Sequence, residues 1–288
     1  MADAGVVGPS VMGWLNRRKF EETGDEAASQ GWTPFILDTN GNGKRDEYVE
    51  PGQPVDPTKD KRGGRQHLCG RSEPGHDGAV WGHPCSAIPG SVVRVAPGAD
   101  PTTSALTELY EPPLPGYGPR GGDVDLDGVY WVALSSGHLG SFDRRKCKVL
   151  NGPTATGAHC PEGWTLHPLP GPQLRDVPDA GSAEASYYVW VDWNDTFGLG
   201  KNVPIVMGNL NSSILAFKDG KLLNFTVPYP MGFFAKNVDG RIDDASAAWK
   251  GRGLWSTYGT RTNFHLEGGK ENRPRAVKFQ LRPDPLAH

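Results

Sequence analysis

The sequence predicts an all-β fold, and three observations carry that prediction. The chain of 288 residues contains 39 glycines and 26 prolines, which interrupt helices and mark turns. Long amphipathic helical patterns are scarce, whereas short runs of β-branched and aromatic residues recur between turns. The order turn, strand, turn, strand also repeats along the chain. Its length suits one large β domain or two small ones.

The segment 121–145 shows this order most completely. The sequence Asp-Gly at 127–128 marks a turn, because glycine admits a positive φ. The run VYWVAL at 129–134 predicts a buried strand, and 138–143 predicts a second strand after a turn at 135–137. The same order begins at two further Asp-Gly pairs, which predict turns at 77–78 and 239–240.

Further strands fill the intervals between these turns. The segments with strand character are 80–81, 91–97, 105–110, 164–169, 188–191, 213–217, 222–225, 253–258 and 275–281. Asp219-Gly220 predicts a two-residue hairpin between two of them. A unit of roughly 40 to 50 residues built from short strands is typical of a propeller blade.

The pattern D-G-x-x-W … G-x-x-x-x-F-D, spread over about 77–283, resembles the blade motif of virginiamycin B lyase-like (streptogramin lyase-like) β-propellers. The resemblance implies a β-propeller-like array of about four antiparallel blades, either small and closed or incomplete. An incomplete array would expose sheet edges and favour oligomerisation. In those lyases a magnesium ion and a His/Glu set open a macrolactone by elimination. No segment here reproduces that set, so the resemblance implies the scaffold rather than the activity.

We expect two regions, an irregular N-terminal segment at 1–60 and the propeller-like domain at 61–288. A charged stretch at 17–28 in the first region predicts a short helix. The segment 38–50, DTNGNGKRDEYVE, predicts a calcium loop in the same region. Its ligand positions 1, 3, 5 and 9 are Asp38, Asn40, Asn42 and Asp46, and Gly43 allows the sharp bend between them.

The calcium loop is incomplete, because position 12 is Val49 instead of a bidentate glutamate. Glu47 or Glu50 would have to replace it, and the alternative is a polar turn that needs no ion. A second candidate cation site, for calcium or magnesium, is formed by the alternating carboxylates Asp123, Asp125 and Asp127. Alternating aspartates also cap turns, and that interpretation stays open.

Four cysteines stand at 69, 85, 147 and 160, none of them in a zinc-ribbon or haem-attachment spacing. Cys147 and Cys160 bracket a loop rich in Gly, Pro and Thr, which favours a disulfide between them. Two reduced buried thiols are the alternative. A disulfide would favour a periplasmic or extracellular setting.

Composition excludes several classes of function. The net charge of −3 gives no basic excess for nucleic-acid binding, and no apolar run approaches ~18 residues, so we expect no membrane span. The N-terminus lacks the pattern of a signal peptide, so the mature chain begins here or belongs to a longer protein. Motifs of serine hydrolases, zincins and P-loop proteins are absent from the sequence.

The candidate catalytic residues are His138, His265, Glu267 and Glu184. His265 and Glu267 alternate and would share one face of an extended segment, as a base and its orienting group or as two metal ligands. Glu184 precedes an aromatic run, 187–193, suited to a sugar or another ring-shaped ligand. The alternatives are a structural histidine and aromatic residues that form the blade core.

Two hypotheses of function follow. The first is a secreted, metal-assisted lyase or hydrolase acting on a lactone, ester or polysaccharide. The second is a non-catalytic, calcium-stabilised module that binds a carbohydrate or a protein. In either case we expect a small-molecule or carbohydrate ligand.

Overall fold

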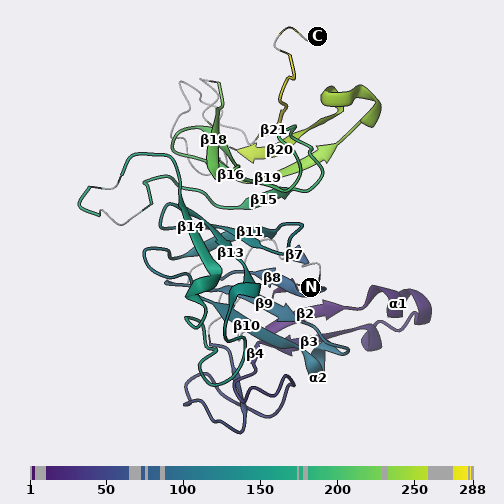
Figure 1. The fold of residues 1–288 in the computed structure, drawn as a ribbon. Coiled ribbons are helices and arrows are strands. Elements are labelled where there is room, and N and C mark those ends of the chain that lie inside the picture. The colour runs from purple at the N-terminus through teal and green to yellow at the C-terminus, as the bar shows by residue number, and fades with distance from the viewer. Residues whose placement is uncertain are drawn as a thin grey trace, which may run out of the picture. The chain divides into compact units, whose positions relative to one another are not determined.

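Strands make up most of the secondary structure in the computed structural model (Figure 1). The structure describes residues 2–3, 11–64, 73–74, 77–84, 88–173, 175–177, 181–228, 233–258, 275–284 and 286. Helices within these residues are short: α1 (Arg17–Thr23), α2 (Pro101–Ser104) and the 3₁₀ segments η1 (Ala27–Ser29), η2 (Arg144–Lys146), η3 (Pro161–Gly163) and η4 (Ala245–Gly251). The predicted all-β class is confirmed, and α1 confirms the short helix predicted in 17–28.

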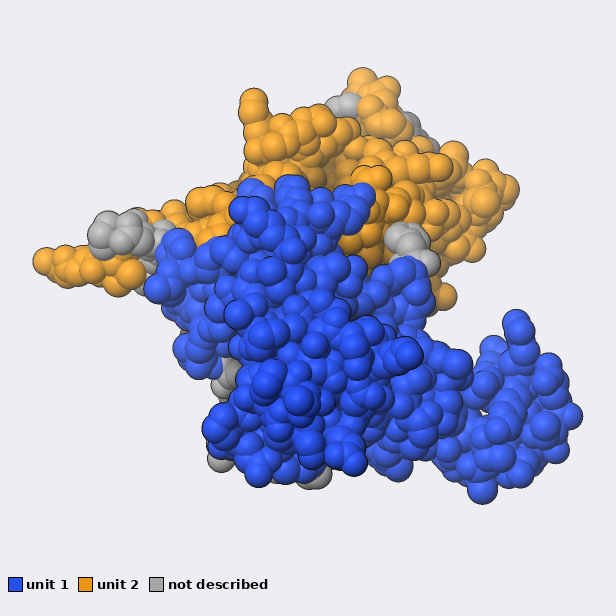
Figure 2. Space-filling view, turned by 60° about the horizontal axis from the view of Figure 1, so that its bottom comes forward, with its two compact units in different colours: residues 1–120, 142–165 blue, residues 121–141, 166–288 orange. Residues whose placement is uncertain are grey.

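The chain divides into two compact units, coloured blue and orange in Figure 2. Unit 1 comprises residues 1–120 and 142–165, and unit 2 comprises residues 121–141 and 166–288. None of the described helices is both long and apolar enough to cross a membrane.

Unit 1 contains a hairpin-based sheet of β1 (Ala2–Asp3), β2 (Val11–Leu15) and β3 (Gln30–Pro34), in that order. A small sheet places β6 (Asp60–Arg62) between β4 (Ile36–Leu37) and β5 (Tyr48–Val49), antiparallel to β4 and parallel to β5. An antiparallel blade-like sheet has the order β10-β9-β8-β7, formed by β7 (Glu73–Pro74), β8 (Val80–Gly82), β9 (Val92–Ala96) and β10 (Leu106–Tyr110).

One buried cluster joins these sheets within unit 1. It combines Met12 of β2 and Phe35 and Leu37 near β4 with Val93 and Val95 of β9, together with Ala105 and Leu109. Residues on both sides of the boundary predicted at residue 60 therefore share one core.

Two more four-stranded sheets follow in chain order. The first consists of β11 (Pro119–Val124), β12 (Tyr130–Leu134), β13 (His138–Phe142) and β14 (Trp164–Pro168). The second is antiparallel and consists of β15 (Val189–Asp192), β16 (Val203–Gly208), β17 (Ser213–Lys218) and β18 (Lys221–Thr226). The described part of the last sheet has three antiparallel strands, β19 (Ala235–Ile242), β20 (Arg252–Tyr258) and β21 (Arg275–Phe279).

Consecutive sheets of unit 2 pack through shared apolar clusters. Ala133 and Leu139 pack with Val189, Val206 and Leu215 of the next sheet. A second cluster joins that sheet to the last one, through residues such as Trp190, Ile205, Ile214, Val238 and Leu254. Four-stranded meanders that follow one another and pack in this way form the predicted β-propeller-like array of blades.

Three of the four predicted Asp-Gly turns are present. Gly78 and Gly128 have φ of 77° and 80°, and Asp219 and Gly220 have φ of 50° and 76° in the hairpin between β17 and β18. Positive φ at both central residues is the geometry of a tight hairpin turn. The disulfide predicted between Cys147 and Cys160 is also present.

The turn predicted at 239–240 is wrong. Asp239 and Gly240 lie inside β19, where they pair with Trp255 and Leu254 of β20. Gly240 is required for another reason: a Cβ there would lie 2.1 Å from the ring of Trp190. The glycine lets an indole from the neighbouring sheet approach the strand backbone.

Candidate functional site

The predicted calcium loop follows β4 and wraps around the carboxylate of Asp38. Oδ1 of Asp38 accepts hydrogen bonds from the backbone N–H groups of Gly41 (2.8 Å) and Asn42 (3.1 Å). Oδ2 accepts one from Gly43 (2.8 Å). Gly41 and Gly43 have φ of 80° and 75°, so glycines at these positions allow the bend. Asp38 is thereby the organising residue of the loop.

The side chains at positions 3, 5 and 9 of the loop converge. The amides of Asn40 and Asn42 both donate to Oδ2 of Asp46, over 2.9 and 2.5 Å. These two hydrogen bonds, that of Asn40 first, lower the pKa of Asp46 and keep the carboxylate charged. The amide oxygens accept hydrogen bonds from backbone N–H groups of the same loop, Oδ1 of Asn40 from Asn42 (3.1 Å) and Oδ1 of Asn42 from Lys44 (2.8 Å).

The loop is anchored to the disulfide-closed segment of the same unit. Asn151 donates from Nδ2 to Oδ2 of Asp38 over 2.9 Å, and Gly152 donates from its backbone to the Asp38 carbonyl over 2.7 Å. A cavity of about 270 Å³ borders this junction, with Asp38, Gly43 and Asn151 among its lining residues. The cavity gives solvent a route to the loop.

The second predicted cation site does not assemble. Asp123 is buried in β11, and its Oδ2 accepts a hydrogen bond from the backbone of Val191 over 2.8 Å. Asp125 caps the turn by accepting from the backbone N–H groups of residues 127 and 129. Asp127 accepts from the Asn202 amide over 3.0 Å. Each carboxylate therefore has its own structural donors, which is the turn-capping role that alternating aspartates often have.

Within the residues that the structure describes, no three His, Cys, Asp or Glu side chains are grouped so as to hold a metal ion. The loop 38–46 contributes two carboxylates, Asp38 and Asp46, and its other side-chain oxygens belong to Asn40 and Asn42. Its fit to calcium depends on amide and carbonyl oxygens in addition to carboxylates.

His138 and Glu184 lie in segments of unit 2 that contact each other. Gly181 donates from its backbone to the Ser136 carbonyl over 3.0 Å, which joins the turn before His138 to the segment before Glu184. His138 is buried, its Nδ1 lies 3.0 Å from Oγ of Ser136, and burial lowers its pKa. This imidazole is therefore neutral at pH 7.

Glu184 is held by main-chain groups. Its Oε1 accepts hydrogen bonds from the backbone N–H groups of Ala185 (2.8 Å) and Leu210 (2.7 Å). These bonds fix the entry to β15 against the turn that precedes β17. The other two predicted catalytic residues, His265 and Glu267, lie outside the described residues.

The aromatic run 187–193 contributes to the blade core. Trp190 is buried in the cluster between the last two sheets, and Tyr188 packs against Gly121. Tyr187 contacts Phe234, and the indole of Trp193 donates to the Val124 carbonyl over 2.8 Å. The core interpretation of these aromatics agrees with their positions.

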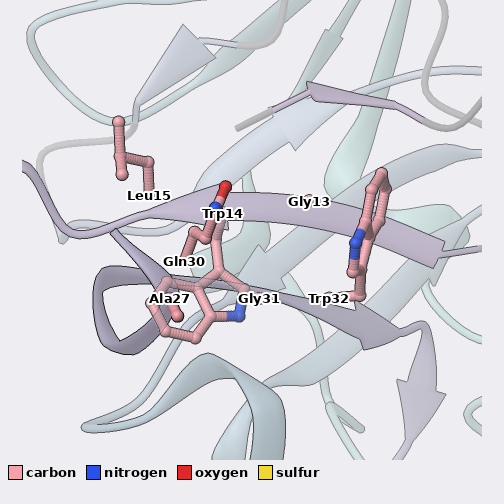
Figure 3. A pocket seen from close by; sticks show the side chains of 7 residues that line it. All are labelled: Gly13, Trp14, Leu15, Ala27, Gln30, Gly31 and Trp32. Carbon is pink, nitrogen blue, oxygen red and sulfur yellow. The ribbon is translucent and has the colours of Figure 1, made fainter. Parts of the chain in front are cut away.

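An exposed aromatic face that sequence reasoning missed lies on the β2–β3 hairpin. The face borders a hollow of about 610 Å³ (Figure 3). The residues around it are Gly13, Trp14, Leu15, Ala27, Gln30, Gly31 and Trp32. The available signal was one tryptophan in each of the segments 11–15 and 30–34, but Gly13 and Gly31 interrupt their strand pattern.

The two tryptophans of this hairpin have different surroundings. Trp14 packs over Gly31 and donates from Nε1 to Oγ1 of Thr102 over 3.1 Å. Trp32 pairs with Gly13 across the hairpin and is 57% exposed. Since Gly13 has no side chain, β2 does not cover the Trp32 ring, and Figure 3 shows the two indoles apart from each other.

Comparisons with known proteins give structural likeness only. No protein-family model matches the chain, and no curated protein sequence matches it. Among solved structures, a streptogramin B lyase has a TM-score of 0.41 at 15% identity, covering 88% of this chain and 73% of the other. A virginiamycin B lyase from Staphylococcus aureus has a TM-score of 0.43 at 13% identity, covering 87% and 74%. A catalytically inactive variant of the Staphylococcus aureus lyase with quinupristin also has a TM-score of 0.43, at 12% identity with the same coverage.

Proposed function

We propose that the protein is a calcium-stabilised binding module of the β-propeller type, with its ion in the loop 38–46. The observation that carries the proposal is the convergence of Asn40, Asn42 and Asp46, whose side chains meet within hydrogen-bonding distance. Alternating oxygen-bearing side chains around a glycine bend are the donor set of calcium loops.

The ion has a structural role in this proposal. The loop joins β4 to β5 and is attached through Asp38 to the segment closed by the Cys147–Cys160 disulfide. A cation held between Asp38 and Asp46 would offset the repulsion between these carboxylates and fix both segments. Structural calcium and a disulfide together suit a periplasmic or extracellular setting.

A calcium titration tests the proposal. Isothermal titration of the full chain with CaCl₂, after treatment with a chelator, should show one site, and MgCl₂ should bind more weakly. At 100 times the Kd, calcium should stabilise the protein by about 2.7 kcal/mol. The variant D46N should lose at least tenfold in affinity, whereas D176N, an exposed aspartate of another loop, should not. No calcium-dependent change in the thermal midpoint at millimolar concentrations would overturn the proposal.

The ligand-binding face in this proposal is the β2–β3 hairpin, and its ligand is a carbohydrate. An exposed indole offers a flat apolar face with a polar edge, which suits the face of a sugar ring. The amide of the exposed Gln30, on the same hollow, would hydrogen-bond hydroxyl groups.

Glycan-array binding of the full chain tests this assignment. W32A should lose at least tenfold in affinity for the glycans that wild type retains. L114A removes another exposed apolar side chain (86% exposed) and should bind as wild type does. Equal binding by W32A would move the ligand site elsewhere.

The second candidate function, a metal-assisted lyase or hydrolase, draws support from His138. A neutral imidazole hydrogen-bonded to Ser136 has the protonation state of a general base. Incubating the full chain and MgCl₂ with a macrocyclic lactone and a nitrophenyl ester, followed by mass spectrometry, tests this candidate. H138A should abolish turnover. Equal turnover in H138A, or none in wild type, would eliminate it.

A further inference from the structure

Asp60 lies beside the proposed calcium loop, although it is 14 residues after Asp46 in the sequence. It begins β6 and is fully buried. Its Oδ2 accepts a hydrogen bond from the backbone N–H of Asp46 over 2.7 Å, which fixes the carboxyl group against the loop. A buried carboxylate at this position needs an explanation, because burial of an uncompensated charge is costly.

The other oxygen of Asp60 is buried and has no hydrogen-bond partner among the described residues. Buried carboxylate oxygens normally accept hydrogen bonds or bind cations. The hydrogen bond from Asp46 occupies Oδ2 and leaves Oδ1 as the oxygen that could bind a cation.

No ion pair to Asp38, Asp46 or Asp60 is found among the described residues, although the loop's asparagine hydrogen bonds and, less strongly, the charge of Lys44 lower the pKa of Asp46. The guanidinium of Arg45 donates to Oγ1 of Thr33 and to the Pro101 carbonyl. Lys59 pairs with Glu47 over 3.0 Å, and Lys61 donates to the Gln53 carbonyl. Arg45, Lys59 and Lys61 therefore have partners other than these three carboxylates.

Strand pairing brings Asp60 next to the C-terminal end of the loop. Strands β5 and β6 are parallel, with Tyr48 opposite Asp60 and Val49 opposite Lys61. Val49 occupies position 12 of the loop, where a calcium loop normally has a bidentate glutamate. Asp60 therefore lies on the strand beside the end of the loop, opposite position 11, and its hydrogen bond from Asp46 turns the carboxyl group toward the loop.

We propose that Asp60 is the closing ligand of the calcium site, contributed through Oδ1 from β6 in place of a residue at position 12. The inference rests on the proposed calcium loop and adds a ligand from outside it. The expected ligands are Asp38, Asn40, Asn42, Asp46 and Asp60, with water able to enter from the adjoining cavity. Oxygen ligands from both the loop and a neighbouring strand would tie β6 to the loop.

Calcium titration of D60N in the full chain tests the inference. Asparagine has the same shape and can still accept the N–H of Asp46, so the fold should be kept. D60N should bind CaCl₂ at least tenfold more weakly and lose most of the calcium-dependent rise in thermal midpoint. Its midpoint without calcium should equal or exceed that of wild type, because a buried charge is removed.

D56N is the matched control, because Asp56 lies in the same segment and is only half-buried, and its carboxylate accepts hydrogen bonds from Thr58. It should bind calcium as wild type does. If wild type binds calcium and the Kd of D60N is within twofold of the wild-type Kd, the inference about Asp60 is wrong. The proposed calcium loop would not be contradicted by that result. Failure of wild type itself to bind would overturn both. If D60N does not fold by circular dichroism, the titration is repeated with D60S under the same criteria.

Discussion

Asn151 donates a hydrogen bond to Asp38 over 2.9 Å although 113 residues separate them in the chain. The same junction contains the bond from Gly152 to the Asp38 carbonyl. Asp38 accepts four hydrogen bonds through its carboxylate, three from its own loop and one from Asn151. The geometry of the loop 38–46 thus depends partly on a segment that the disulfide closes.

The variant N151A should be less stable than wild type. It removes one donor from a largely buried carboxylate, and such a hydrogen bond to a charged group contributes about 1.5–3 kcal/mol. Urea denaturation at pH 7 with chelator present measures the change. Asn194, which lies in another loop and whose side chain shows no such long-range bond among the described residues, serves as the control through N194A. Equal midpoints for N151A and wild type would contradict the prediction.

Replacing the disulfide should also destabilise unit 1. Cys147 and Cys160 are 13 residues apart, and closing a loop of that size contributes about 3 kcal/mol in the chain-entropy model. The double variant C147S/C160S should lower the free energy of unfolding by that order. It should also weaken calcium binding, since Asn151 and Gly152 lie within the closed loop. Unchanged calcium affinity would show that the loop 38–46 holds its shape alone.

The sequence was sufficient for strands with a clear apolar pattern and for turns with a local signal. Residues 130–134 and 138–142 and the hairpin at 219–220 are found where the pattern placed them. The sequence pattern did not predict the strand β16, because Pro204 interrupts its apolar run. In the structure all residues of β16 are buried. A prolyl ring in a paired strand is a tertiary outcome that a local pattern does not predict.

Contacts between distant segments explain the other differences. The sequence pattern predicts a turn at Gly240. In the structure a glycine is needed there because the ring of Trp190, 50 positions earlier in the chain, leaves no room for a Cβ atom. Of the candidate site, the loop at 38–46 could be predicted from spacing alone. Asp60 could not, because only the pairing of β5 with β6 brings it to the loop.

Glu108 should be among the residues most sensitive to substitution in unit 1. Its carboxylate accepts two bonds from Arg144 (2.6 and 2.7 Å), one from Arg94 (2.9 Å) and one from the Tyr110 hydroxyl (2.6 Å). E108Q removes the charge partner of Arg144, whereas Arg94 keeps its ion pair with Asp77, and the loss should cost about 3 kcal/mol. The exposed pair Arg17–Glu21 is the control, and E21Q should cost less than about 0.5 kcal/mol. Similar losses for both variants in urea denaturation would contradict the prediction.

Adding one methyl group at Gly240 should disrupt the packing of unit 2. The new Cβ would overlap the Trp190 ring, and overpacking of this kind costs about 1–3 kcal/mol. G52A is the control, because a Cβ at Gly52 meets no atom within 4 Å. Thermal unfolding should show a lower midpoint for G240A alone. In a G240A/W190F double variant, the smaller ring should restore part of the loss.

Acid should destabilise the protein through His83. This side chain is fully buried, and burial lowers its pKa from the usual 6.5 to about 3. The unfolded chain therefore binds a proton below pH 6.5 that the native protein does not bind until about pH 3. Stability from this group is complete above pH 6.5 and falls by about 1.4 kcal/mol for each pH unit between these values. Urea denaturation of wild type and H83Q at pH 7.0 and 5.0 measures the difference. H83Q should lose less stability than wild type between the two pH values, and parallel losses would show that other groups cause the acid dependence.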